Sequence, residues 1–264
     1  MQQLSVIKIG GNIIDDEKKL RYFLGNFSKI KGKKVLVHGG GKIATEVSQK
    51  LGIKTKMVDG RRITDADTLK VVTMVYAGLV NKNIVAMLQA NKCNAIGLTG
   101  ADGNTIPANK RKVKEIDYGF VGDIKQSQVS SLKSQVFLDN DLVPVYCALT
   151  HDGRGNLLNT NADTIASVLA VGLSKKYEVS LVYCFESSGV LKEVNDERSL
   201  IKNISSKDYP ELKNKKIISG GMIPKMDNAF DAIKKGVKYV YICHADHILG
   251  ILSKRSLKRT QLSR

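Results

Sequence analysis

The sequence predicts an α/β fold, a mostly parallel sheet covered by helices on both faces. Short apolar runs alternate along the chain with longer segments of helical periodicity, the pattern of a parallel sheet with helical crossovers. Strands are expected near residues 5–9, 35–38, 56–59, 94–98, 143–148, 179–184 and 238–243. Helices are expected over 16–30, 42–51, 65–91, 127–140, 163–173 and 226–235.

Length and composition suit one large domain or two closely packed lobes. The chain has 264 residues, of which 42% are hydrophobic and 25% charged, as in ordinary globular proteins. No apolar stretch approaches the ~20 residues of a membrane span, so no membrane association is expected. Met1 to Leu4 lead straight into the first strand, which predicts a cytoplasmic protein without a signal peptide.

The net charge of +17 raises nucleic acid as a partner. The lysines are spread along the chain, however, and no aromatic platform accompanies them, so a solvated surface is favoured and no nucleic acid is expected. The four cysteines, at 93, 147, 184 and 243, form no CxxC pair. Buried free thiols are therefore predicted, with no protein metal site.

Two segments between the strands have distinctive patterns. Thr64, three residues before Asp67, resembles a capping box at the start of the 65–91 helix, whose apolar stripe is long enough to leave surface for a subunit contact. Residues 104–124 carry a basic run followed by Tyr118-Gly119-Phe120-Val121-Gly122-Asp123. That pattern predicts an inserted hairpin, of a kind that often acts as a lid.

Three glycine turns indicate the chemistry. Lys8-Ile9-Gly10-Gly11 ends the first strand, His38-Gly39-Gly40-Gly41 ends the second, and Gly220-Gly221-Met222-Ile223-Pro224-Lys225 opens a late helix. Glycine turns expose backbone N–H groups to an oxyanion, and lysine in an apolar strand is costly unless it is paired. Together they predict a site that holds a phosphate chain and stabilises a phosphoryl group during transfer.

Other interpretations of these residues stay open. Gly39-x-Gly41-x-x-Ala44, with Asp59 after the next strand, can be the fingerprint of an NAD-binding oxidoreductase. An earlier Lys-x-Gly-Gly strand and the basic turn after Asp59 weaken that interpretation. Asn161 or Asp163 can be a simple helix cap, and His38 is expected to brace its loop.

Six motifs taken in order resemble the amino-acid kinase family. They are the three glycine turns together with Gly60-Arg61-Arg62-Ile63-Thr64, Gly119-Phe120-Val121-Gly122-Asp123 and Asn159-Thr160-Asn161-Ala162-Asp163, and they span residues 5 to about 245. The resemblance implies an open αβα sandwich with an N-terminal lobe (1–175) for an acyl amino acid and for dimerisation, and a C-terminal lobe (176–264) for ATP. It also implies Mg²⁺·ATP-dependent phosphorylation of the γ-carboxylate of N-acetyl-L-glutamate, or of N-succinyl-L-glutamate, in arginine biosynthesis.

The resemblance also implies a role for each site residue. Lys8 and Lys225 would stabilise the transferring phosphoryl group, and Asp163 would orient both lysines. Gly10, Gly11, Gly40 and Gly41 would donate backbone N–H groups to the phosphates and the attacking carboxylate, and Arg62 and Asn159 would hold the substrate. The adenosine side would use Glu186, Ser187, Ser188, Gly189, Val190 and Leu191 with Ile217, Ile218 and Ser219. Phosphate oxygens would hold Mg²⁺, so no metal ligand is named.

The chain departs from the family pattern in two places. Glu186-Ser187-Ser188 stands where the family usually has an aspartate and often a proline, and Arg259-Thr260 replaces a C-terminal Gly-Thr. Arginine-inhibited members carry an extra N-terminal helix, whereas here the first strand begins by Ser5; a homodimer without arginine inhibition is therefore expected. A kinase for carrier-linked aminoadipate or glutamate remains an alternative within the family.

Overall fold

The computed structural model describes residues 1–58, 60–125, 131–193, 196–253, 255–256 and 258–264. The central strands are β1 (Gln2–Ile9), β2 (Lys33–His38), β5 (Ala95–Leu98), β8 (Val143–Cys147), β11 (Tyr177–Phe185), β12 (Asn203–Ser205), β13 (Tyr239–His244) and β14 (Arg259–Ser263). They form one eight-stranded sheet in the order β12-β14-β13-β11-β1-β2-β8-β5. Six neighbouring strands, from β13 to β5, run parallel, so the predicted α/β class is confirmed.

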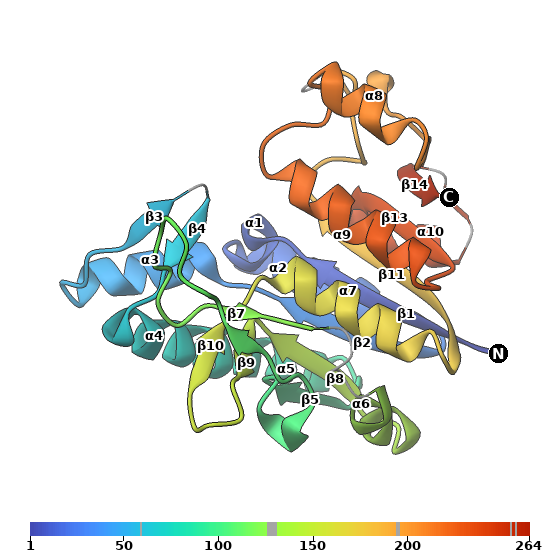
Figure 1. Ribbon diagram of the computed structural model, residues 1–264. Helices are drawn as coiled ribbons and strands as arrows, with labels where there is room; N and C mark the ends of the chain where they lie inside the picture. The colour runs from blue at the N-terminus through green and yellow to red at the C-terminus, as the bar shows by residue number, and fades with distance from the viewer. Residues whose placement is uncertain (59, 126–130, 194–195, 254, 257) are drawn as a thin grey trace.

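The helices are α1 (Gly11–Ile14), α2 (Glu17–Ser28), α3 (Gly41–Lys50), α4 (Ala66–Thr73), α5 (Asn81–Ala90), α6 (Ser131–Asp139), α7 (Ala162–Leu173), α8 (Tyr209–Asn214), α9 (Met222–Lys234) and α10 (Ile248–Leu252). α6, α7 and α9 pack on one face of the sheet, and α2, α5 and α10 form the layer on the other face. This open αβα sandwich is visible in Figure 1, where α7 (yellow) and α9 (orange) cross in front of the strands. The helix predicted from residue 127 is described only from Ser131, and Asp59 lies outside the described residues.

The core follows from the apolar strand runs. The side chains of β1 are buried from Leu4 onward, and every residue of α7 except Thr164 is buried between the sheet and its neighbours. A strand buried on both faces should carry no charged side chain without a partner. Lys8 is a charged side chain in the buried part of β1, and its partner defines the site described below.

The edge of the sheet after β13 differs from the sequence prediction. β14 pairs antiparallel with β13 and parallel with β12, so these two edge strands run against the other six. Neither strand was predicted, because three to five residues of mixed polarity carry no clear period. They become strands because they pair with the edge of an existing sheet, and the sequence pattern does not show that pairing.

The long predicted helix forms, but with a different cap. α4, the π-helical segment η1 (Met74–Val80) and α5 run as one helix from Ala66 to Ala90. Its N-cap is Asp65, whose carboxylate accepts the N–H of Thr68 at 2.8 Å. Thr64 was the wrong choice of cap, because its backbone is paired with the hairpin, donating to Tyr118 O and accepting from Phe120 N.

The same helix corrects the expectation about membrane spans. It is the one helix in the described chain that is long and apolar enough to cross a membrane, with a mean hydropathy of 1.5 over an 18-residue window that is 44% buried. A half-buried core helix meets the same criterion of length and composition. Here the buried side packs against α2, α3, β5 and β8, so the expectation that no stretch approaches that length is wrong as stated.

Three small hairpins stand beside the main sheet. β3 (Lys56–Val58) pairs with β4 (Arg61–Ile63), β6 (Asn109–Lys110) with β7 (Gly122–Asp123), and β9 (Leu149–His151) with β10 (Leu157–Asn159). The hairpin predicted within 104–124 is therefore confirmed. The strand predicted at 56–59 belongs to a hairpin instead of the central sheet, and the β9–β10 hairpin was missed.

Candidate active site

Lys8, Asp163 and Lys225 meet in the interior although they are far apart in the sequence. Lys8 Nζ lies 2.8 Å from Asp163 Oδ1, and Lys225 Nζ lies 3.5 Å from Asp163 Oδ2. Both ammonium groups also lie over the ring of Phe185, at 5.5 and 5.3 Å from its centroid. The structure thus brings the three predicted residues into one cluster, with the carboxylate between two cations.

Each member of this cluster reaches it from a different element. Lys8 stands near the C-terminal end of β1, Asp163 in the first turn of α7, and Lys225 in the first turn of α9. Asn161 is the cap of α7, accepting the N–H groups of Asp163 and Thr164, so Asp163 itself is free to bind lysine. The alternative in which Asp163 merely caps the helix is therefore wrong.

The carboxylate of Asp163 is charged in spite of its burial. Burial alone would raise the pKa of Asp163, but the ammonium groups of Lys8 and Lys225 outweigh it and hold that pKa below its usual value. One anion facing two cations leaves the cluster with excess positive charge. That charge is available to a ligand that brings negative charge of its own.

Three helices that begin at the glycine turns have no side-chain cap. α1 starts after Gly10, α3 after Gly40 and α9 after Gly221, and none of these N-caps makes a side-chain hydrogen bond, whereas Asp16, Asp65 and Asn161 cap α2, α4 and α7. The first N–H groups of a helix need acceptors, and the helix dipole favours an anion there. The uncapped ends therefore fit the phosphate groups of a nucleotide.

The glycines at these turns have separate structural reasons. Gly40 has φ +153°, and a Cβ there would lie 3.0 Å from the ring of Tyr76, so a larger residue would be strained at this position. Gly10 donates its N–H to Cys184 O at 3.1 Å. The N–H of Gly10 is therefore already bound to β11. Of the two glycines predicted to donate to phosphate, Gly11 is the one whose N–H is not bound to that strand.

Arg62, Asn159, Gly40 and Gly41 all line one cavity of about 240 Å³. Arg62 is 8% exposed, and its guanidinium donates to Gly41 O and Thr45 Oγ1, both at 2.8 Å, and to Thr55 Oγ1 at 3.2 Å. Asn159 Nδ2 donates to Thr64 Oγ1 at 3.0 Å. The structure therefore gathers the four predicted substrate-binding residues around one space, with Arg62 held in place by three hydrogen bonds.

Glu186 lies in a polar network that the sequence did not indicate. Its carboxylate accepts from Asn12 Nδ2 at 2.5 Å and from Lys19 Nζ at 2.8 Å, and the other end of the Asn12 amide accepts from Lys42. The hydrogen bonds from Lys19 and Asn12 lower the pKa of Glu186. These contacts join the segment after β11 to α1, α2 and α3, and Asn12 and Lys42 stand directly beside two of the glycine turns.

The rest of the predicted adenosine loop is braced by β14. Val190 N donates to Thr260 Oγ1 at 2.8 Å, and a Cβ on Gly189 would lie 2.5 Å from the same oxygen. Thr260 Oγ1 donates in turn to Ile201 O at 2.6 Å. Thr260, which sequence reasoning left without a role, thus supports the loop. Ile217 to Ser219 lead into α9, with the Ile218 side chain only 1% exposed, and their contact with a nucleotide stays a prediction.

His38 braces its glycine turn, as predicted. The fully buried ring bonds Gly39 O through Nδ1 at 2.7 Å and meets Asn81 Nδ2 through Nε2 at 3.0 Å. Burial lowers the pKa of His38 from 6.5 to about 4, although the hydrogen bond to Gly39 opposes that shift. The imidazole is therefore neutral in the folded protein.

This burial predicts a pH dependence of stability. Between pH 6.5 and about 4 the unfolded chain binds a proton at His38 that the folded chain does not, so stability falls as the pH is lowered through this window. The loss should reach about 3 kcal/mol, since one pKa unit corresponds to about 1.4 kcal/mol. Urea unfolding across the window measures it. His38→Gln removes the titrating ring, and an unchanged pH slope in that variant would contradict the assignment.

Within the described residues, no group of three or more His, Cys, Asp or Glu side chains is placed to hold a metal ion. The arrangement of two lysines, one carboxylate and the uncapped helix ends suits phosphoryl groups, because it offers positive charge and backbone donors. Among the residues that the structure describes here, no nucleophilic side chain is paired with a base.

The chain is similar to several known proteins. The amino acid kinase family model matches residues 3–244. An acetylglutamate kinase of Cytophaga hutchinsonii is 54% identical over 263 residues, covering 99% of both chains, and one of Bacteroides thetaiotaomicron is 55% identical, covering 94% of this chain and 95% of that protein. Among solved structures, smu.665 of Streptococcus mutans has a TM-score of 0.79 at 26% identity, covering 98% of both chains. The carbamate kinase of Giardia lamblia bound to AMP-PNP, 14% identical with a TM-score of 0.70 over 99% of this chain and 98% of that one, shares the fold.

The chain therefore belongs to the amino acid kinase family. This membership favours phosphoryl transfer over the dinucleotide-binding interpretation of the second glycine turn, whose Asp59 lies outside the described residues.

Proposed function

We propose that this protein transfers the γ-phosphoryl group of ATP to the γ-carboxylate of N-acetyl-L-glutamate, a step of arginine biosynthesis in the cytoplasm. Relatives named acetylglutamate kinase, 54% and 55% identical over nearly their whole length, support the substrate. The observation that carries the proposal is the pair of lysines held by Asp163 between the glycine turns. The two lobes, 1–175 and 176–264, would bind the acyl amino acid and the nucleotide.

The proposed chemistry needs positioning and charge more than acid–base catalysis. A carboxylate is already nucleophilic, so no general base has to remove a proton before it attacks phosphorus. Lys8 and Lys225 face the charge that redistributes over the phosphoryl oxygens, and Asp163 keeps both ammonium groups in place. Gly11 and Gly41 supply backbone N–H groups. Mg²⁺, held by phosphate oxygens, would neutralise part of the phosphate charge.

Release of ADP with three substrates in parallel tests this function. N-acetylglutamate should be turned over, and free glutamate should fail because its charged α-amine would lie where Asn159 meets a neutral amide. Turnover of glutamate equal to that of the acylated substrate would contradict the role of Asn159. Protection by ATP against thermal unfolding gives an independent check, since a ligand at 100 times its Kd adds about 2.7 kcal/mol.

The third substrate in this assay is N-succinylglutamate. One feature of the cavity could accommodate the extra carboxylate of its acyl group. Arg111 lines the cavity beside Arg62 and Asn159 and binds Asp123 through Nε and Nη2, while its Nη1 is buried with no hydrogen-bond partner in the described chain. A carboxylate at the end of the acyl group could accept from this nitrogen. If N-succinylglutamate is the better substrate, Arg111→Leu should remove that preference and leave turnover of N-acetylglutamate comparatively unchanged.

Arg62 is proposed to bind the carboxylate that does not react. Its contact should be similar in the ground and transition states, so Arg62→Ala should raise KM for the acylglutamate more than it lowers kcat. Arg62→Lys should also raise KM, because one ammonium group cannot reach Gly41, Thr45 and Thr55 and also bind a carboxylate as a fork. Steady-state kinetics at varied acylglutamate measure both constants. A fall in kcat at unchanged KM would contradict this role.

We also infer a homodimer joined through the Ala66–Ala90 helix. Met74 and Leu79, 54% and 50% exposed, lie on its outer side, where a partner subunit would cover them. Light scattering should give twice the mass of the chain, and Leu79→Glu should shift it toward the monomer. We expect no inhibition by arginine. A hexamer, or loss of activity in arginine, would contradict this proposal.

A further inference from the structure

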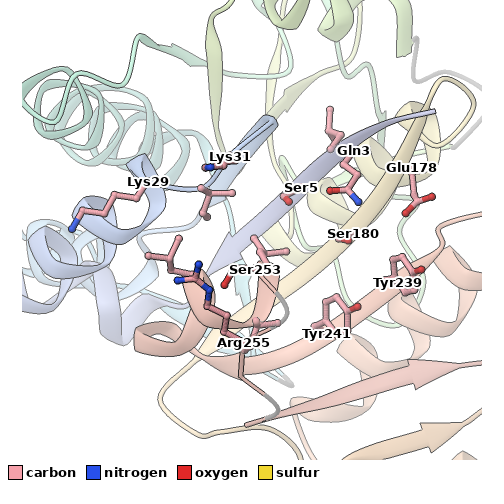
Figure 2. A pocket seen from close by; sticks show the side chains of 15 residues that line it. Gln3, Ser5, Lys29, Lys31, Glu178, Ser180, Tyr239, Tyr241, Ser253 and Arg255 are labelled. Atoms are coloured by element: carbon pink, nitrogen blue, oxygen red, sulfur yellow. The ribbon is translucent and has the colours of Figure 1, made fainter.

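A second cavity, of about 410 Å³, lies on the other face of the sheet, toward the strand ends opposite the lysine cluster. Its floor is formed by the first halves of β1 and β11 and by β13, and its roof by α10 and the end of α2 (Figure 2). Lys8 points from β1 toward α7, so Ser5, three residues earlier, points to the opposite face. The cavity therefore shares its strands with the active site but not its side chains.

The floor of this cavity is polar where a covered sheet face is normally apolar. Ser5 aligns with Ser180 on β11, which aligns with Tyr239 on β13. Two residues further along β1, Ile7 aligns with the apolar Val182, and both are fully buried. Figure 2 shows Ser5 and Ser180 side by side. Because serine is small, Ser5 and Ser180 leave space above the sheet, whereas the larger Ile7 and Val182 fill the corresponding space two residues further along.

Ser5 gives a second reason to expect a ligand. Ser5 lines the cavity, and its hydroxyl makes no hydrogen bond with the described residues, so it is open to a molecule in that space. A polar ligand there would exchange hydrogen bonds with this hydroxyl in place of water.

The charges around the cavity favour an anion. Arg255 and Lys31 border the space, whereas the side chain of Lys29 extends away from it in Figure 2. The acidic residue of the lining, Glu178, is bound to Lys238 at 2.6 Å. The cations that remain would attract a negatively charged molecule, and a guanidinium ligand such as arginine would find no carboxylate that is not already paired.

We propose that this cavity binds a small carboxylate-bearing effector, held by Arg255 and Lys31 with hydrogen bonds from Ser5 and Ser180. The ligand would contact β1 and the end of α2 together with β11, β13 and α10, which come from the two halves of the chain. β1 also carries Lys8, and β11 also carries Phe185. Occupancy would therefore link the halves from the side opposite the catalytic cluster. This binding does not depend on the proposed kinase reaction.

Calorimetric titration with citrate tests the site. ADP and N-acetylglutamate are kept at saturation without Mg²⁺, so that the active site cannot bind the probe. The wild-type protein should give saturable binding at low millimolar citrate. Arg255→Ser should weaken it at least tenfold, and Ser180→Leu, which fills the floor, should abolish it.

Lys258→Ser provides the matched control, because it removes one exposed positive charge near the chain end outside the cavity lining. It should bind citrate like the wild type. The proposal is overturned if citrate does not bind, if Arg255→Ser and Lys258→Ser bind it equally, or if L-arginine binds in its place. Arg255 is exposed, so its variant should fold even if Ser180→Leu does not.

Discussion

Replacing Lys8 or Lys225 with alanine is expected to lower kcat about a hundredfold or more, equivalent to ~3 kcal/mol, as for loss of one oxyanion donor. The reason is the position of the two ammonium groups, 2.8 and 3.5 Å from the Asp163 carboxylate and beside uncapped helix ends. In the proposed reaction they meet charge that builds on the transferring phosphoryl oxygens. An interaction strengthened in the transition state affects kcat more than binding.

The measurement is kcat for ADP release at saturating substrates, together with thermal protection by ATP to show that each variant still binds nucleotide. Lys235→Ala is a matched control, because Lys235 directly follows α9, is exposed and pairs with Asp231 in an i,i+4 contact. Wild-type kcat is expected for that control. A wild-type kcat for Lys225→Ala would show that the third glycine turn takes no part in phosphoryl transfer.

Replacing Asp163 with asparagine should lower stability and activity together. Asp163 is 5% exposed and its carboxylate binds both lysines, so its loss leaves two cations close together without a counter-charge. Breaking a buried ion pair by removing one partner costs about 3–5 kcal/mol. Partial exposure of Lys225 places the expected destabilisation near the lower limit, about 3 kcal/mol. kcat should fall as well, because the lysines lose their common orientation.

Urea unfolding of the wild type and Asp163→Asn measures the first effect, and ADP release under native conditions measures the second. Asp231→Asn serves as control, since its pair with Lys235 is exposed and should contribute less than about 1 kcal/mol. Equal stability of Asp163→Asn and the wild type would mean that the carboxylate makes no net electrostatic contribution to the fold.

Acid should weaken the same cluster. The pKa of Asp163 is lowered in the folded protein, so its stabilising contribution is present above the unfolded-state pKa and is lost as the pH falls through the folded value. His38 acts at higher pH, because its stabilisation begins to fall below pH 6.5. The two groups therefore predict separate stages of acid destabilisation.

Local sequence patterns were sufficient to predict a feature where a residue type in a given setting has one common physical explanation. A lysine in an apolar strand needs a partner, and a glycine turn after a strand suits an anion, so Lys8 and the three turns could be identified before the structure. The parallel sheet was predictable for the same reason, since apolar runs alternating with helical periodicity allow few other folds.

Long-range contacts were not predictable in this way. The cap at Asp65 was missed because Thr64 is paired with the hairpin, and the network around Glu186 depends on Asn12, which is 174 residues away. β14 and its Thr260 acquire a role only by pairing with β13 and supporting Val190. Each of these depends on which segments become neighbours.

The sequence by itself thus determined the α/β class and the glycine turns and singled out Lys8, because burial and backbone conformation restrict which residues are tolerated at such positions. Asp163, Lys225, Arg62 and Asn159 were predicted from the resemblance to the amino-acid kinase family. Only the tertiary structure gave the distances from Asp163 to the two lysines, the hydrogen bond from Gly10 N–H to Cys184 O, and the second cavity that Ser5 lines. These are matters of distance and direction between elements. Sheet register and helix packing set them, and no local pattern records either.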